Sequence, residues 1–423
     1  MKKIFYILFA GMVLTTSYAL MSCSEELDPN SIFDTTEYPL DKSSYTFPLD
    51  TFCKVNYLEP YNLKYIYKME DVGTDMDYNL IPASYDKSIL LAVLCKYLWY
   101  DVYREYVGKE EGDGLTFLKK YSPRIIHVIG SPAYDPNKQT ETLGTAEGGL
   151  KITLYKANSL NPSDIDFMNT YFFKTMHHEF SHILNQNVNR PTDFDLISHG
   201  KYNPLDWNET HDSLALGRGF ISNYASSQAR EDWVELIANY IVWDTITWNK
   251  MLTTASFQWE EVKNVKAEYW EKINRQVGAG LANRDTVGYK VDVEASYADG
   301  KDYLLRVVRK SVQRDADDEF AVTDENGNIV YVETQGFNGR TVILQKLQMV
   351  REWLEKYFDY DLEKVRMAVQ RRQYATDENG DFLFDTYGRF VNNLTYVRPD
   401  GTTIVDSLVN QVKEYEKLQQ KQD

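Results

Sequence analysis

Three of the chain's six histidines lie within one short stretch, residues 175–186, which reads TMHHEFSHILNQ. Two of them, His178 and His182, are four residues apart and enclose Glu179 in an H-E-x-x-H pattern. On a helix, residues with this spacing lie one above the other on the same face, so both imidazoles can bind one metal ion. Two histidine nitrogens are half of the ligands of a tetrahedral zinc ion. The spacing therefore predicts a zinc site on a helix.

Glu179 follows the first histidine of this pattern and is rotated towards the open side of the predicted metal. Zinc lowers the pKa of a bound water to about 7, and a carboxylate beside that water can take its proton and pass it to a leaving group. The pattern therefore predicts hydrolysis with Glu179 as general base. A structural helix, whose histidines only make hydrogen bonds in the core, is the alternative. His177, about 100° away around the helix, is expected to support a ligand or the core.

A third ligand is needed, because a catalytic zinc site usually has three protein ligands and one water. The pattern H-E-x-x-H-x-x-G-x-x-H is excluded, since Asn185 and Val188 stand where it requires glycine and histidine. An aspartate soon after His182 is one alternative, and Asp193 or Asp195 on the following loop would supply it. The other alternative is a glutamate on a later helix.

The stretch EDWVE at 231–235 offers such a glutamate. Glu231 and Glu235 are one helical turn apart on the same face. The apolar residues around them indicate a buried helix, in which a carboxylate needs a partner. Glu231 is therefore the predicted third metal ligand, and Glu235 is the predicted hydrogen-bond acceptor for a ligand histidine. Two solvent-facing carboxylates are the alternative.

Together the two stretches resemble the gluzincin arrangement, in which a glutamate on a second helix completes a zinc site begun by H-E-x-x-H. The stretch GFISNYASSQAREDWVEL at 219–236 is similar to that of a zinc metallopeptidase family found in lipoproteins. Members of this family resemble the catalytic domain of anthrax lethal factor around the site. In that pattern a tyrosine seven residues before the ligand glutamate stabilises the oxyanion, and Tyr224 stands at this position. The resemblance therefore implies an oxyanion-stabilising role for Tyr224.

As a whole, the chain resembles the import-associated zinc metallohydrolase lipoproteins of Bacteroidetes, which are encoded beside TonB-dependent outer-membrane importers. The motif-bearing resemblance covers about 160–245. It implies an α+β fold with a zincin-like metallopeptidase core, built from a mixed sheet, an active-site helix and a second ligand-bearing helix. It also implies zinc as cofactor, a peptide or protein substrate, and an outer-membrane importer as partner. In zincin-like folds an edge strand pairs with an extended substrate, and residues 148–155 are expected at that edge, with an interior strand as the alternative.

The leading hypothesis is thus a zinc metallopeptidase in which Glu179 moves protons and Tyr224 supports the oxyanion. One alternative is a non-catalytic accessory lipoprotein that binds a nutrient for an importer. The presence of Glu179 argues against it, because metal binding alone does not need this residue. The other alternative is a zinc hydrolase of a non-peptide substrate, such as a glycan or a cell-wall amide, and the sequence does not separate it from a peptidase.

The N-terminus predicts export and a lipid anchor. Residues 1–22 combine two lysines with a short apolar stretch, as in a signal peptide. The following LMSC resembles a bacterial lipobox, so Cys23 is the expected lipidation site. The acidic stretch SEE at 24–26 resembles a surface-export signal, so we expect an outer-membrane lipoprotein exposed at the cell surface, with the periplasmic face as the alternative. A net charge of −17 argues against a nucleic-acid partner.

The elements that must position the site follow from hydrophobic periodicity. Helices are expected at 86–108, 163–187, 228–248 and 343–372, and strands at 124–131 and 148–157. Ser163 is the expected N-cap of the metal-binding helix. Asn-Gly turns predict hairpins at 323–332 and 376–385.

The expected organisation runs from an export signal to a C-terminal tail. Its parts are a signal peptide (1–22), a tether (23–58), a zincin-like catalytic region (59–250), a helical region packing on the core (251–375) with a hairpin-containing insertion at about 280–338, and a C-terminal hairpin and tail (376–423). Cys53 and Cys95 remain after lipidation, and the sequence is compatible with either a disulfide or two buried thiols.

Overall fold

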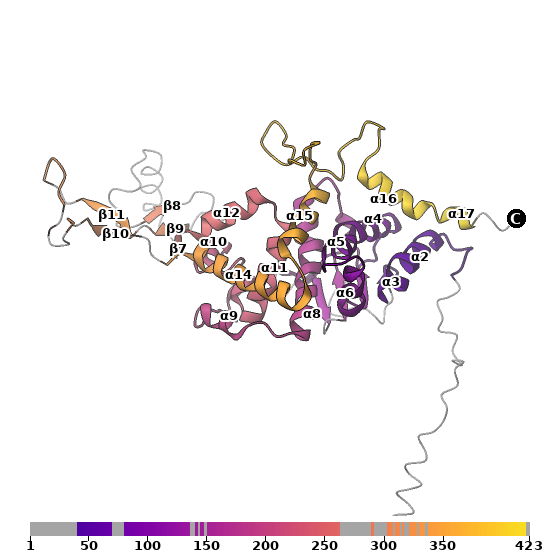
Figure 1. The fold of residues 1–423 in the computed structure, drawn as a ribbon, viewed down its shortest axis with the longest axis horizontal. Helices are drawn as coiled ribbons and strands as arrows, with labels where there is room; N and C mark the ends of the chain where they lie inside the picture. Colours follow the sequence, from indigo (N-terminus) through magenta and orange to yellow (C-terminus); the bar gives the residue numbers. More distant parts are fainter. Residues whose placement is uncertain are drawn as a thin grey trace, which may run out of the picture. The chain divides into compact units, whose positions relative to one another are not determined.

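The computed structural model describes most of the chain, and Figure 1 shows its ribbon. The described residues are 40–69, 80–135, 140–142, 144–147, 150–262, 289–291, 303–307, 309–313, 315–316, 320, 322–327, 330–334 and 337–419. The predicted signal peptide (1–22) and the lipidation site Cys23 lie outside them, as do parts of the predicted insertion (280–338). Contacts divide the chain into Met1–Phe47 and Pro48–Asp423, and the second unit contains the predicted site.

A small mixed sheet and many helices make the second unit an α+β structure, as predicted. The order of the sheet is β1 (Lys64–Ile66), β2 (Ile125–Val128), β6 (Lys151–Leu154) and β5 (Gly144–Glu147). The first three strands are parallel, and Tyr65, Ile126 and Ile152 align across them and are buried. Strand β5 runs antiparallel to β6.

The edge of this sheet differs from the prediction. Residues 148–155 were expected at the edge, but β6 lies between β2 and β5, so it is an interior strand. The edge strand is β5, which comes just before β6 in the chain. Its sequence, GTAE, has no aromatic residue and only one β-branched residue, so it carries little strand signal.

The helix that carries the H-E-x-x-H motif is continuous from residue 165 to residue 187. It consists of α7 (Ile165–Met168), the π-helical segment η6 (Asn169–Phe173) and α8 (Lys174–Asn187). Its N-cap is Asp164 and not the predicted Ser163, because the Asp164 carboxylate accepts a hydrogen bond from Phe167 N at 2.9 Å. Serine and aspartate are comparable N-caps, so propensity does not distinguish the two positions.

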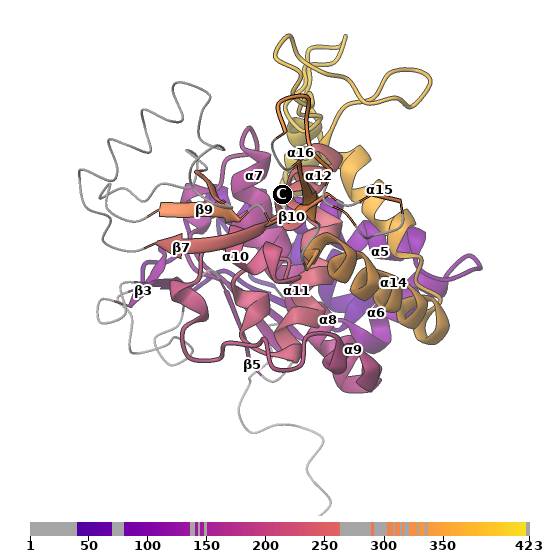
Figure 2. The same ribbon diagram turned by 90° about the vertical axis from the view of Figure 1, so that its left-hand side faces the viewer.

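The second ligand-bearing helix, α11 (Ala229–Val242), lies beside α8 in both views (Figures 1 and 2). It ends earlier than the predicted 228–248, because Asp244 caps a separate helix, α12 (Thr245–Ala255), and accepts a hydrogen bond from Thr247 N at 2.8 Å. An N-cap signal within an otherwise helical pattern therefore splits the predicted helix.

A buried amide network joins the end of α11 to the metal helix. Asn169, in η6, donates a hydrogen bond to Val242 O at 2.9 Å and accepts one from the Gln373 amide at 2.6 Å. Gln373 belongs to α15 (Leu362–Gln373), which also contacts α11. The two amide side chains and the Val242 carbonyl are thus hydrogen-bonded to one another away from water. The network therefore fixes how the two ligand-bearing helices lie.

The predicted helical stretch 343–372 is two helices, α14 (Gly339–Phe358) and α15. The break falls at Asp359, which adopts the left-handed conformation with φ of 48°. Asp361 then caps α15 by accepting hydrogen bonds from two backbone N–H groups. Both helices contact α11.

The tether is shorter than predicted. Within the predicted range 23–58, residues 47–58 form α2 (Phe47–Cys53) and the π-helical η2 (Lys54–Leu58). Leu49, Phe52 and Tyr57 are at most 1% exposed. With Cys53 they follow the i, i+3, i+4, i+8 spacing of a helix with one apolar face, and their burial makes the segment part of the core.

The C-terminal residues are also more structured than a hairpin and tail. A bridge pairs Thr376 with Phe382 across the predicted Asn-Gly turn, and α16 (Ile404–Lys413) buries its apolar face. The remaining elements are α3 (Glu59–Tyr61), α4 (Tyr85–Cys95), η4 (Lys96–Tyr100), α5 (Asp101–Tyr106), α6 (Asp113–Tyr121), β3 (Ala133–Asp135), β4 (Thr140–Thr142), η5 (Ala157–Ser159), α9 (Thr192–Ile197), η7 (Trp207–Glu209), α10 (Asp212–Gly217), η8 (Tyr224–Ser226), β7 (Gln258–Val262), β8 (Tyr289–Val291), β9 (Tyr303–Val307), β10 (Arg309–Val312), β11 (Tyr331–Thr334) and α17 (Glu416–Gln419). Among the described residues, none of the helices combines the length and apolar character that a membrane crossing requires.

Gly339, the first residue of α14, meets the ends of α10 and α12 so closely that no side chain fits. A Cβ there would lie 2.1 Å from Leu216 O and 2.9 Å from the carbonyl oxygens of Gly217 and Ala255. Because these atoms are backbone, we expect Gly339→Ala to lower the free energy of unfolding by about 3 kcal/mol, more than its gain in helix propensity. Urea unfolding measures this, with the exposed Arg340→Ala as control. Equal stability of the two variants would contradict the close approach.

Candidate metal centre

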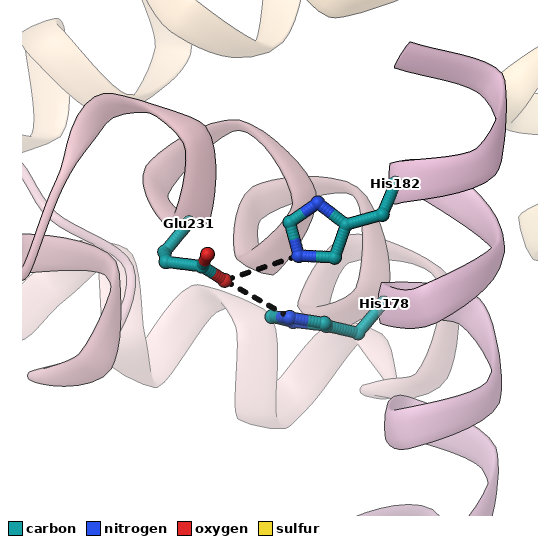
Figure 3. Close-up of side chains that lie close together, drawn as sticks. All are labelled: His178, His182 and Glu231. Carbon is teal, nitrogen blue, oxygen red and sulfur yellow. Dashed lines mark hydrogen bonds and ion pairs between the residues drawn. The ribbon is translucent and has the colours of Figure 1, made fainter. Parts of the chain in front are cut away.

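Two histidines of α8 and one glutamate of α11 point towards one another (Figure 3). Glu231 Oε2 lies 3.2 Å from His178 Nε2 and 3.1 Å from His182 Nε2. The three potential ligand atoms lie within 4.8 Å of one another, and no other such group of metal-binding side chains occurs among the described residues. The structure thus brings together the three residues that the sequence predicts as metal ligands.

Glu235 contacts the imidazole ring of His178 at Nδ1, the nitrogen that does not face Glu231. Its Oε1 lies 2.9 Å from His178 Nδ1, while its Oε2 accepts hydrogen bonds from Ser222 Oγ at 2.7 Å and Asn239 Nδ2 at 3.1 Å. The Lys174 ammonium lies 3.7 Å from the same carboxylate. An Nδ1–H donated to Glu235 leaves the Nε2 lone pair of His178 free for a metal. Glu235 therefore lies where the sequence places it.

The charges of this cluster favour a cation at its centre. Burial opposes a charge on His178, but hydrogen bonds to Glu231 and Glu235 outweigh it and raise the pKa of His178 to about 9. Burial also opposes charge on Glu231, but the two histidines hold the pKa of Glu231 well below its usual range. The carboxylates that stabilise a proton on His178 would equally stabilise a divalent ion at the shared position.

The two carboxylate oxygens of Glu231 have different partners. Arg230 Nε lies 3.1 Å from Glu231 Oε1, and the Gln228 amide donates to the same oxygen at 3.4 Å. These contacts leave Oε2 facing the imidazoles. A ligand carboxylate that is itself hydrogen-bonded is typical of protein metal sites.

The donor set fits zinc. Two imidazole nitrogens and one carboxylate oxygen from buried or half-buried residues form a site of the histidine-histidine-glutamate type, with one position left for water. The ring centroids of His178 and His182 are 4.9 Å apart, so both rings can reach one ion. Glu231 and Glu235 supply the negative charge that a divalent ion needs.

The aspartate alternative has no support in this geometry. Asp195 forms a two-pronged pair with Arg190, at 2.8 and 2.9 Å, and Asp193 is exposed. Neither joins the cluster of His178, His182 and Glu231.

Glu179 is half-buried on α8, directly after the ligand His178. Burial raises the pKa of Glu179, and the neighbouring carboxylates Glu231 and Glu235 act in the same direction, while the two ligand histidines oppose them. A carboxylate with a raised pKa binds a proton more tightly, which suits a residue that must accept one from water.

Tyr224 lies against the ligand ring of His178. Their ring centroids are 5.8 Å apart and the rings are stacked at 30°. Trp207 also packs edge-on against this tyrosine, with ring centroids 4.7 Å apart at 67°. Burial and the nearby carboxylates raise the pKa of Tyr224, so its hydroxyl stays protonated and can donate a hydrogen bond.

His177 is a core residue. It is fully buried, and its Nδ1 lies 2.9 Å from the Tyr103 hydroxyl, which in turn accepts a hydrogen bond from Tyr360 at 3.2 Å. Burial lowers the pKa of His177 to about 3, so the ring is neutral. Of the expected roles, the structural one fits this position.

Several supporting residues are not predicted by the sequence. They are Lys174, Trp207, Ser222 and Asn239. Asn239 lies one turn after Glu235 on α11, and Lys174 one turn before His178 on α8, so helical spacing could have found both. Trp207 begins the short helix η7 and Ser222 lies in a loop, and the periodicity of the sequence does not determine the path of such short segments.

Comparisons with known proteins agree with this geometry. A family model described as "Putative zinc-binding metallo-peptidase" matches residues 42–363. A crystal structure of a protein described in the same words, from Bacteroides caccae, is 29% identical to this chain with a TM-score of 0.51. That match covers 78% of this chain and 94% of the other. No curated protein matches the chain.

Proposed function

Because the chain belongs to this family of zinc-binding metallopeptidases and takes zinc as its cofactor, we propose that it is a zincin-like peptidase whose centre is His178, His182 and Glu231. The family implies a hydrolase with a peptide or protein substrate. The observation that carries the proposal is the convergence of three ligand atoms within 4.8 Å, two from the helix that also presents Glu179 and one from α11.

The chain's own residues divide the work of hydrolysis. Zinc supplies Lewis-acid polarisation of the scissile carbonyl and lowers the pKa of water. Glu179 accepts the proton of the attacking water and donates it to the leaving amine. Glu235 keeps the His178 ring in its orientation through the contact at 2.9 Å.

Tyr224 donates a hydrogen bond to the oxyanion of the tetrahedral intermediate. Its stacking on His178 places the phenol beside the metal position. Tyr224→Phe keeps the ring but removes the donor, so we expect kcat to fall about 10²-fold, with zinc affinity unchanged. Steady-state kinetics and chelator competition measure both, with the exposed Tyr387→Phe as control. Loss of zinc with loss of activity would instead make Tyr224 a support of the metal.

The zincin-like part of the proposal rests on sheet order. Strand β5 ends the four-stranded sheet and runs antiparallel to β6. Both strands precede α8 in the chain and contact it. An extended substrate would add to the free side of β5 through main-chain hydrogen bonds.

We further propose that the protein is a lipoprotein of the outer membrane, anchored through Cys23, surface-exposed and associated with a nutrient importer. The support is the lipobox-like LMSC and the acidic residues after it. Cys23→Ala is expected to abolish incorporation of labelled palmitate and to move the protein from the membrane fraction to the soluble fraction. Ser24→Ala is the matched control, and membrane retention of Cys23→Ala without label would contradict the anchor.

One experiment separates the peptidase from its alternatives. Purified protein is analysed for metal and incubated with a mixed peptide library. We expect about one zinc per chain, from the ligand count, and cleavage of peptides. Zinc without cleavage of any peptide would favour a binding lipoprotein, and release of products from cell-wall material alone would favour a hydrolase of non-peptide substrates.

A further inference from the structure

A buried lysine far from the motif residues in the chain connects two of the segments that build the metal centre. Lys346, in α14, is 1% exposed at its side chain, and so is Asp232. Lys346 Nζ donates to Asp232 Oδ2 at 2.6 Å and to Gly219 O at 2.8 Å. Asp232 follows the ligand Glu231 in the first turn of α11.

The second acceptor, Gly219, opens the loop that carries the other site residues. Three residues further on, Ser222 donates to Glu235, and Tyr224 then stacks on His178. One ammonium group therefore joins the loop with Tyr224 to the helix turn with Glu231. The same segment also reaches α11 through Ser222 and η8, so the Lys346 ammonium adds a separate connection at the first turn of α11.

Other residues of α14 contact the same two segments as Lys346. One helical turn earlier on α14, Val342 lies so close to Gly219 that a Cβ there would be 2.6 Å from its side chain, and Gly219 has a φ of +88°. Two turns later, Trp353 packs edge-on against Trp233 at 5.2 Å. The same face of α14 thus contacts the loop and α11 at successive turns.

Both members of the pair have further partners. The Tyr202 hydroxyl donates to Asp232 Oδ2 at 3.0 Å, and the Lys346 ammonium lies 4.4 Å from the centre of the Phe220 ring. Removing two charges from water costs several kcal/mol per ion, and an apolar pair of similar volume often stabilises a fold equally well. A buried pair of this kind therefore contributes mainly a fixed geometry.

We propose that Lys346 is a positioning residue of the metal centre, which sets the Tyr224 loop and the Glu231 turn at a fixed distance from each other. This inference rests on the proposed function. The pair touches neither the predicted metal position nor substrate, so its effect passes through Glu231, Ser222 and Tyr224. A displacement of about 1 Å at such groups is enough to cost about 10²-fold in rate.

The test compares Lys346→Met with the double variant Asp232→Asn/Lys346→Met. The single change leaves Asp232 buried without its cation, whereas the double change removes both charges. Lys356→Met, on an exposed turn of the same helix, is the control. Each protein is measured for thermal stability, zinc affinity by chelator competition, the visible spectrum of its cobalt-substituted form, kcat and KM.

We expect the double variant to recover most of the stability lost by Lys346→Met. It should nevertheless keep a kcat about 10–100-fold below wild type, a smaller change in KM and an altered cobalt spectrum. Wild-type kcat and cobalt spectrum in the double variant would overturn the inference and leave the proposed function standing. Absence of both zinc binding and peptide cleavage in the wild-type protein would overturn the two together.

Discussion

We expect Glu179→Gln to lower kcat by about 10³-fold while the protein still binds zinc. The substitution keeps the size and hydrogen-bonding shape of the side chain but removes its ability to accept a proton. Neither His178, His182 nor Glu231 is altered, and the three ligand atoms stay within 4.8 Å of one another. The loss should therefore appear in the chemical step, with little change in KM.

This result is read from single-turnover cleavage of the best library peptide together with metal content. The exposed Glu378→Gln is the matched control, because it makes the same chemical change on the C-terminal hairpin. An unchanged kcat in Glu179→Gln would remove this residue from the mechanism. A variant that loses zinc would instead show that Glu179 supports the metal.

We expect Glu231→Gln to weaken zinc binding by more than about 100-fold. Loss of an outer hydrogen-bond partner of a ligand already costs about 10–100-fold in affinity, and Glu231 is the predicted ligand itself. The amide also removes the negative charge that both imidazoles face at 3.1 and 3.2 Å. Competition with a chromogenic chelator at fixed pH measures the change.

Glu235→Gln provides the comparison for this variant, since it alters only the contact behind His178. Its zinc affinity should fall less than that of Glu231→Gln, within the range of about 10–100-fold. If Glu231→Gln bound zinc as tightly as wild type, the third ligand would have to come from elsewhere, and Asp193 or Asp195 would be the residues to substitute next.

The sequence predicts the parts of the site that depend on residues close together in the chain. The four-residue spacings of His178 with His182 and of Glu231 with Glu235 place each pair on one face of a helix, whatever the rest of the fold does. That these two helices lie side by side does not follow from spacing. The resemblance to gluzincins implies it, and the family match shows that the chain belongs to a family of zinc-binding metallopeptidases.

The parts that sequence reasoning missed depend on contacts between distant segments. Lys346 occupies a helical position that could as well face solvent, and the approach of α14 to α11 and to the segment at Gly219 buries it. The edge strand β5 has too weak a strand pattern to compete with the stronger pattern of β6. The predicted helix 228–248 is too long, because Asp244 is compatible both with a helix interior and with the N-cap of the next helix, α12.

Cys53 and Cys95 are both free and buried, which settles the alternative that the sequence left open. Burial raises the pKa of each thiol, so almost no reactive thiolate exists at neutral pH. Alkylating reagents can therefore reach them only when α2 or α4 transiently detaches from the core. The rate at which these two cysteines are alkylated therefore reports how often the core opens locally. The measurement needs neither an added fluorophore nor a substituted residue.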